Sequence, residues 1–148
     1  RFEGEDIPTT GYSKHRREHV SLVFQDHNLI DYLTPEENLR LVNPKADMKI
    51  LEDLGLSREE SKRNIMHLSG GQRQRVAVGR ALVAPGRAIL ADEPTGSLDP
   101  EMTDEVIDLL RHAAHQLGKC VIVVTHSKRV ADSADAVYTL RHKKLAKA

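Results

Sequence analysis

The stretch from Leu68 to Pro100, LSGGQRQRVAVGRALVAPGRAILADEPTGSLDP, is the most informative part of this chain of 148 residues. It begins with a Ser-Gly-Gly turn at Ser69–Gly71 that runs directly into a helical pattern. Two glycines allow backbone N–H groups to approach an anion closely, and the positive end of the following helix points the same way. Ser69 can cap that helix and also donate its hydroxyl to a phosphate oxygen. Taken alone, such a turn is more often an ordinary capped loop.

The second part of the stretch is the apolar run Ala88–Ala91, which ends in two adjacent acids, Asp92 and Glu93. The run is typical of a buried strand, and in open α/β sheets ligands bind at the carboxyl ends of the strands. One carboxylate could hold Mg²⁺ or its waters while the next orients an attacking water. By itself, the acidic pair is more simply interpreted as a solvated turn.

Together the two parts resemble the nucleotide-binding subunits of ABC transporters. Leu68–Gln72 matches the signature loop of that family, Ala88–Glu93 its Walker B strand with the catalytic Glu, and Ser97–Asp99 its D-loop. The context VFQDHNLIDYLTPEENL resembles the Q-loop and places Gln25 in it. His126, which follows the apolar run KCVIVVT, matches the switch His of the family.

The resemblance implies a role for each of these residues in a site for ATP and Mg²⁺. Asp92 would hold the metal, and Glu93 would orient the attacking water. Gln25 and His126 would contact the metal site and the γ-phosphate. In a head-to-tail homodimer or heterodimer, residues of this chain would also complete the ATP site of a second ATPase domain. These residues are Ser69, Gly70, Gly71, Gln72 and Asp99. Asp99 would couple the two ATP sites.

Apolar runs that alternate with helical patterns predict an α/β fold with a mainly parallel sheet. The expected strands are Val20–Phe24, Ala88–Ala91 and Lys119–Thr125, the last interpreted as fully buried. One more strand is expected at Ala136–Leu140, followed by a frayed basic tail at Lys143–Ala148. The resemblance implies the three-layer, P-loop NTPase-like core of an ABC ATPase plus a helical subdomain, with the N-terminal part of the domain missing.

The resemblance also divides the chain into three parts. Residues 1–25 would hold the end of a β subdomain, with a polar strand-and-turn segment at residues 1–10, a basic helix at residues 11–19 and the Q-loop strand. Residues 26–68 would form the helical subdomain, which is expected to begin at a Thr34 cap and to break at Asn43–Pro44 and at Gly55. Residues 69–148 would hold the signature helix and the C-terminal part of the catalytic core.

Two longer helices are expected in the last part. One runs from Gly71 to Val83, and the other begins at Asp99–Pro100 and stops at Gly118. The buried stripe of the second is predicted to consist of Met102, Val106, Leu109, Leu110, Ala113 and Leu117.

The composition excludes several classes of function. Basic and acidic residues both number 22, so the formal net charge is zero and a nucleic-acid partner is not supported. The single cysteine, Cys120, rules out an internal disulfide and fits a reducing cytosol. No apolar run approaches the roughly 20 residues that span a bilayer. The resemblance implies a cytoplasmic location on the inner face of the membrane, through a permease that contacts the helical subdomain and the Q-loop.

The Walker A pattern G-x-x-x-x-G-K-[ST] does not occur in the sequence. The resemblance covers the whole chain but only the latter two-thirds of the family's domain, and the chain begins at Arg1 rather than at Met, so we expect Walker A upstream. Because nothing else here would cradle the α- and β-phosphates, the chain alone is predicted to lack ATPase activity and to bind ATP weakly. Apolar strands without cover also predict self-association.

The leading functional hypothesis is an ATPase subunit that couples ATP hydrolysis to transport. Two segments, ADEPTGSLD and NLIDYLTPEENL, are similar to the corresponding segments of the group that includes lipoprotein-releasing, macrolide-exporting and cell-division ATPases. This similarity favours export as the direction of transport. Ser97 differs from that group, in which Asn or Ala is more usual at this position. A soluble DNA-repair ATPase is a second hypothesis, but the short segment between Gln25 and Ser69 lacks the coiled-coil heptads of that class. A non-enzymatic dimerising module is the third.

Overall fold

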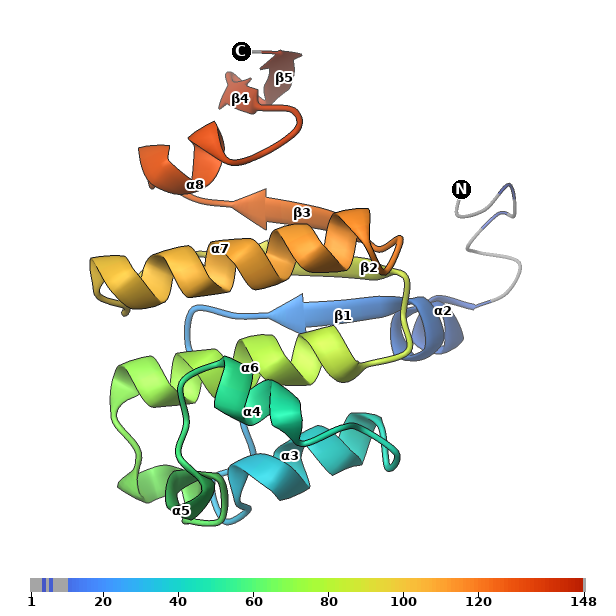
Figure 1. Ribbon diagram of the computed structural model, residues 1–148. Coiled ribbons are helices and arrows are strands. Elements are labelled where there is room, and N and C mark those ends of the chain that lie inside the picture. Colours follow the sequence, from blue (N-terminus) through green and yellow to red (C-terminus); the bar gives the residue numbers. More distant parts are fainter. Residues whose placement is uncertain (1–3, 5, 7–10, 148) are drawn as a thin grey trace.

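A three-stranded parallel sheet in the order β1-β2-β3 forms the centre of the computed structural model, which describes residues 4, 6 and 11–147 (Figure 1). Helices pack below and in front of this sheet, and a small hairpin follows it. In chain order the elements are α2 (Tyr12–His19), β1 (Val20–Val23), α3 (Pro35–Val42), α4 (Lys49–Asp53), α5 (Arg58–Ser61), the 3-10 turn η1 (Ile65–His67), α6 (Gly70–Val83), β2 (Ala88–Asp92), α7 (Pro100–His115), β3 (Cys120–Val124), α8 (Lys128–Asp132), β4 (Tyr138–Arg141) and β5 (Lys144–Lys147). The predicted α/β class with a parallel sheet is confirmed.

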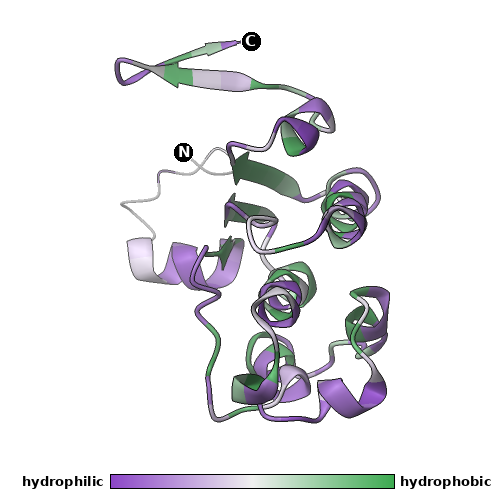
Figure 2. Ribbon diagram, turned by 90° about the vertical axis from the view of Figure 1, so that its left-hand side faces the viewer, coloured by the Kyte–Doolittle hydropathy of each residue, from purple (hydrophilic) through white to green (hydrophobic). Residues whose placement is uncertain are grey.

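The two faces of the sheet differ in their cover. The helices α6 and α7 lie on one face, where Val23, Ile89 and Ala91 are buried (Figure 2). On the other face, Ile122 is 53% exposed and Val124 is 64% exposed. The prediction of a fully buried strand at residues 119–125 is therefore wrong. The physical reason is that, in the described part of the chain, no helix covers this second face of β3.

The helices before α6 pack on it through a close approach at Gly79. A Cβ atom added to this glycine would lie 2.8 Å from Leu54 Cδ1, so the helical segment reaches the α6 backbone itself. The core at this contact includes Leu39, Leu51 and Val76, all with zero exposure. The contact fixes α6, and with it the Ser-Gly-Gly turn, against the segment that contains α3 and α4.

Most predicted element boundaries are confirmed. Thr34 caps α3 in a capping box, and α3 ends at Val42 before the Asn43–Pro44 break. The basic segment forms α2, and Gly55, with φ of 70°, follows α4. The strand-and-turn segment predicted for residues 1–10 lies largely outside the described residues.

Two predictions about the C-terminal part are wrong. Leu117 does not belong to the buried stripe of α7, because the helix ends at His115 and the side chain is 56% exposed. The segment after Arg141 is not a frayed tail, because β4 and β5 pair in an antiparallel hairpin. The turn residues His142 and Lys143 both have positive φ, as a tight hairpin turn requires, but neither is the Gly or Asn that usually signals one.

None of the described helices has the length and apolar character needed to cross a membrane.

Candidate functional site

The candidate residues gather at one edge of the sheet. The three parallel strands end at this edge (Figure 1). The helices α6 and α7, which precede β2 and β3 in the chain, begin at the same edge. Gln25, Glu93 and His126 therefore follow the strand ends, while Ser69 and Asp99 stand at the helix starts. Because a helix N-terminus carries a partial positive charge, an edge with two of them is suited to an anionic ligand.

Glu93 is held between the ends of β2 and β3. Thr125 Oγ1 donates to Glu93 Oε2 at 2.9 Å, and the His126 N–H donates to Glu93 Oε1 at 2.7 Å. The Glu93 N–H donates in turn to the Val124 carbonyl at 2.9 Å. Its backbone has φ of 46°, a left-handed conformation that costs energy for a residue other than glycine. The bonds from Thr125 and His126 hold the carboxylate in one position, and the backbone bond to Val124 holds the residue itself against the end of β3.

Asp92 differs from its neighbour in exposure. It is the last residue of β2, pairs with Val124 across the ladder and is exposed. Among residues 4, 6 and 11–147, no three His, Cys, Asp or Glu side chains group as a protein-only metal site would require. Mg²⁺ commonly uses only one or two carboxylates together with waters and phosphates, so a single exposed Asp92 fits that ion.

The two glycines of the Ser-Gly-Gly turn have different surroundings. A Cβ on Gly70 would meet no heavy atom within 4 Å, whereas one on Gly71 would lie 3.3 Å from the Ser97 carbonyl oxygen and 3.4 Å from Leu98 Cδ2. Gly71 therefore lets α6 start against the segment before α7. Gly70 leaves open space, which a ligand could enter.

Capping side chains shape both helix starts. Ser69 Oγ accepts from the Gln72 N–H at 3.2 Å, and Gln72 Oε1 accepts from the Ser69 N–H at 2.8 Å. Asp99 Oδ1 accepts from the Met102 N–H at 2.9 Å. The Ser69 and Asp99 side chains are thus held in place before any ligand arrives.

Gln74 is a residue that sequence reasoning missed. It is 1% exposed, and its Nε2 donates to the Pro94 carbonyl at 3.0 Å, directly after Glu93. This bond links α6 to the turn that carries the acids. An isolated Gln in the run QRQR has no local feature that predicts the contact, which joins residues 20 apart in the chain.

His27 was also missed, and it lies close to Gly70 and Arg73 at the start of α6. Gln25 itself is exposed, while His27 is partly buried with φ of 63°. Burial, followed by the positive charge of Arg73, lowers the pKa of His27, and a backbone hydrogen bond at Gly70 opposes this shift. The imidazole is therefore expected to be neutral at pH 7. The sequence did not predict this residue, because a histidine carries no local signal for a positive φ.

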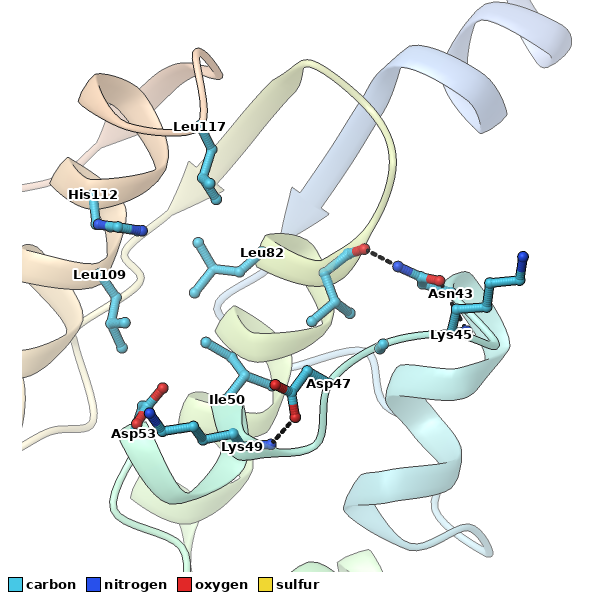
Figure 3. Close-up of a pocket in the computed structure, with 12 residues that line it drawn as sticks. Asn43, Lys45, Asp47, Lys49, Ile50, Asp53, Leu82, Leu109, His112 and Leu117 are labelled. Carbon is cyan, nitrogen blue, oxygen red and sulfur yellow. Dashed lines mark hydrogen bonds between the residues drawn. The ribbon is translucent and has the colours of Figure 1, made fainter.

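A separate hollow of about 660 Å³ lies at the other end of α6 (Figure 3). Apolar side chains such as Ile50, Leu82 and Leu109 line it, and Asn43 Nδ2 donates to the Val83 carbonyl at 2.9 Å on its rim. At about 1.5 Å per residue, this end of α6 is roughly 20 Å from the Ser-Gly-Gly turn. The hollow is therefore not part of the candidate site.

Comparisons with known proteins agree with this geometry. The sequence profile described as "ABC transporter" matches residues 1–96. The ABC transporter ATP-binding protein YclH of Bacillus subtilis is 34% identical over 144 residues, which cover 90% of this chain and 64% of YclH. The lipoprotein-releasing system ATP-binding protein LolD of Rickettsia prowazekii is 40% identical, covering 92% of this chain and 67% of LolD. The macrolide export ATP-binding/permease protein MacB of Brucella melitensis is 40% identical, covering 95% of this chain and 23% of MacB.

A solved structure is similar over almost the whole chain. The dimeric ATP-binding cassette MJ0796, bound to ADP and Pi, superposes with a TM-score of 0.81 at 31% identity, covering 97% of this chain and 68% of that one. The chain thus spans about two-thirds of YclH, LolD and MJ0796 and about a quarter of MacB.

Proposed function

The chain belongs to the ABC transporter family, and from this premise we propose that it is part of a subunit that binds and hydrolyses ATP to drive transport across a membrane. The names of LolD and MacB describe lipoprotein release and macrolide export, which supports export as the direction. The observation that carries the proposal is the fixed position of the Glu93 carboxylate beside the exposed Asp92.

Glu93 is the general base of the proposed reaction. A base must hold its carboxylate toward the attacking water, and the bonds from Thr125 and His126 stop this side chain from rotating. Each carboxylate oxygen retains lone-pair capacity after accepting one hydrogen bond, so one of them can still accept from water. Glu93 thus needs no rearrangement to orient a water at the strand ends.

Asp92 and Gln25 are the residues that would hold Mg²⁺, because both are exposed oxygen donors at the ends of neighbouring strands. The ion would supply positive charge to offset the negative charge of the phosphates. His126 uses its backbone N–H for Glu93, so its exposed imidazole is left to donate to the γ-phosphate.

A second ATPase domain would receive the start of α6. Ser69 is exposed, Gly70 has open space, and the helix N-terminus behind them is positive, so the turn suits phosphate oxygens of a nucleotide on a facing domain. We propose that Gln72 supports this turn and that Asp99 lies beside the same interface. The dimeric form of MJ0796 supports pairing of two ATPase domains, and the head-to-tail arrangement is part of the proposal.

A permease would bind the helical segment and the Q-loop from the cytoplasmic side of the membrane. Tyr32, Leu41 and Met66 are exposed by 80%, 61% and 58%, so this segment offers apolar side chains to a partner. A hollow of about 320 Å³ is lined by Phe24 and Val42, among others, and these residues directly neighbour Gln25 and Leu41 in the chain. These features support docking of an apolar segment close to Gln25.

The decisive experiment is Glu93→Gln in the full-length protein. The Gln carbonyl can still accept from the His126 N–H, and its NH₂ can donate to Thr125 Oγ1, so the site should keep its shape. ATP hydrolysis should fall by at least about 100-fold, the usual contribution of a general base, while the affinity for ATP stays unchanged.

Glu52→Gln is the matched control, because Glu52 is an exposed acid on α4. This variant should hydrolyse ATP at the wild-type rate. Unchanged turnover in Glu93→Gln would remove Glu93 from its role. Absence of ATP binding by the wild-type full-length protein would refute the proposed function as a whole and would favour a dimerising module without activity.

A further inference from the structure

Two capping boxes, 12 residues apart in the chain, are joined by one hydrogen bond. The first box is at the start of α5, where Ser57 Oγ accepts from the Glu60 N–H and Glu60 Oε2 accepts from the Ser57 N–H. The second is the Ser69–Gln72 box at the start of α6. Gln72 Nε2 donates to Glu60 Oε1 at 2.5 Å and connects them.

The carboxylate of Glu60 is charged in this arrangement. Hydrogen bonds from the Ser57 backbone and from the Ser57 side chain are the largest causes that lower the pKa of Glu60, and the bond from Gln72 adds to them. A hydrogen bond from an amide to an ionised carboxylate is shorter and stronger than one between neutral groups. The link between α5 and Gln72 is therefore the strongest kind that this amide can make.

The same link determines how Gln72 is oriented. Its Oε1 must accept from the Ser69 N–H, so its NH₂ must face Glu60, and the reversed amide would break both bonds. With the amide held in this way, the Gln72 N–H keeps its bond to Ser69 Oγ. The Ser69 hydroxyl accepts that bond and has its own hydrogen left to donate.

We propose that Glu60 is a positioning residue for Ser69, acting through Gln72, so that the segment containing α5 and the Ser-Gly-Gly turn move as one unit. This inference rests on the proposed function, in which Ser69 binds a phosphate of the nucleotide held by a facing domain. It assigns to Gln72 a connecting role rather than direct contact with the nucleotide. A displacement of α5, for example by a bound partner, would then reorient the Ser69 hydroxyl.

The test compares Glu60→Ala with Ser57→Ala in the full-length protein. Ser57→Ala removes the Ser57 hydroxyl from the α5 capping box. Glu60 can still accept from the Ser57 N–H and from Gln72 Nε2, so this variant controls for loss of the cap alone. Glu60→Ala should raise the KM for ATP about tenfold with kcat nearly unchanged, because it weakens binding of substrate and transition state alike. Ser57→Ala should change KM by less than about twofold.

A double variant shows whether Glu60 acts through Gln72. If it does, Glu60→Ala combined with Gln72→Ala should raise KM no more than Gln72→Ala does alone. Effects that multiply, or a Ser57→Ala effect equal to that of Glu60→Ala, would overturn the proposal and leave Glu60 as a cap of α5.

Hydrogen–deuterium exchange of the same full-length variants gives a readout that does not depend on ATP. Peptides that contain Ser69 and Gln72 should exchange at least about fivefold faster in Glu60→Ala than in wild type, and at the wild-type rate in Ser57→Ala. If the wild type proves inactive, the proposed function fails while exchange still tests the link. If exchange at these amides is the same in Glu60→Ala and wild type, the link is refuted whatever the activity.

Discussion

The substitution Gly79→Ala tests the contact that holds the helical segment against α6. The new methyl group would lie 2.8 Å from Leu54 Cδ1, whereas ordinary contacts begin at 3.4 Å. Leu54 has zero exposure, so its side chain has no free space into which it can retreat, and either Leu54 or the α6 backbone must shift.

Two opposing effects set the magnitude. Overpacking a well-packed core usually costs about 1–3 kcal/mol. Replacing Gly by Ala within a helix gains about 1 kcal/mol of helix propensity. Gly79→Ala should therefore lower the free energy of unfolding by about 1 kcal/mol, which corresponds to a fall in Tm of roughly 2–4 °C for a chain of this size.

The assay is urea unfolding followed by circular dichroism, for wild type, Gly79→Ala, Leu54→Val and the double variant. Leu54→Val removes the Cδ atoms and should itself cost about 1 kcal/mol. In that background the steric conflict is gone, so Gly79→Ala should be stabilising by about 1 kcal/mol, a change of sign relative to its effect in wild type. A Gly79→Ala effect of the same sign and size in both backgrounds would refute the packing argument.

Three further predictions concern the helix caps and the uncovered sheet face. Asp99→Ala should lower the free energy of unfolding by about 1 kcal/mol in the same urea assay, because the Met102 N–H loses its acceptor. Asp99→Asn should be nearly neutral, since Asn also caps helices well. Equal losses in the two variants would contradict the capping role. Lys119, whose Nζ donates to the carbonyls of Ala84 and Gly86, has its pKa lowered by burial. Between the lowered pKa of the folded state and the ordinary value of 10.5, the unfolded chain therefore binds more protons at Lys119. The stability of wild type relative to Lys119→Met should rise with pH as the pH approaches 10.5, and a difference independent of pH would count against it. The 148-residue chain should self-associate in sedimentation experiments through the sheet face that exposes Ile122, and Ile122→Glu should shift it to monomer; a wild-type monomer would refute this.

The sequence alone predicted the features that depend on neighbouring residues. The caps at Thr34, Ser69 and Asp99 were predictable because each involves a side chain and a backbone N–H three residues later. That Glu93 and His126 would lie at the same edge followed from the rule that parallel strands end together. These predictions needed only the order of the elements along the chain.

Predictions from the sequence failed where the outcome depended on contacts with segments that are distant in the chain. The run Cys120–Val124 is apolar throughout, so its sequence does not distinguish a strand covered on both faces from one covered on a single face. The hairpin turn at His142 and Lys143 has positive φ without the residues that favour it. In both places, contacts rather than residue type decided the result.

The amino-acid sequence by itself therefore determined where the capped helices begin, which apolar runs become the strands of the parallel sheet and which acids follow a strand end. Only the tertiary structure decided that Thr125 and His126 hold Glu93, that Gln74 reaches Pro94 and that Glu60 reaches Gln72. The reason is physical: a cap is closed within one turn of backbone. These other bonds join residues 12 to 33 positions apart, and they form only after strand register and helix packing have brought the segments together.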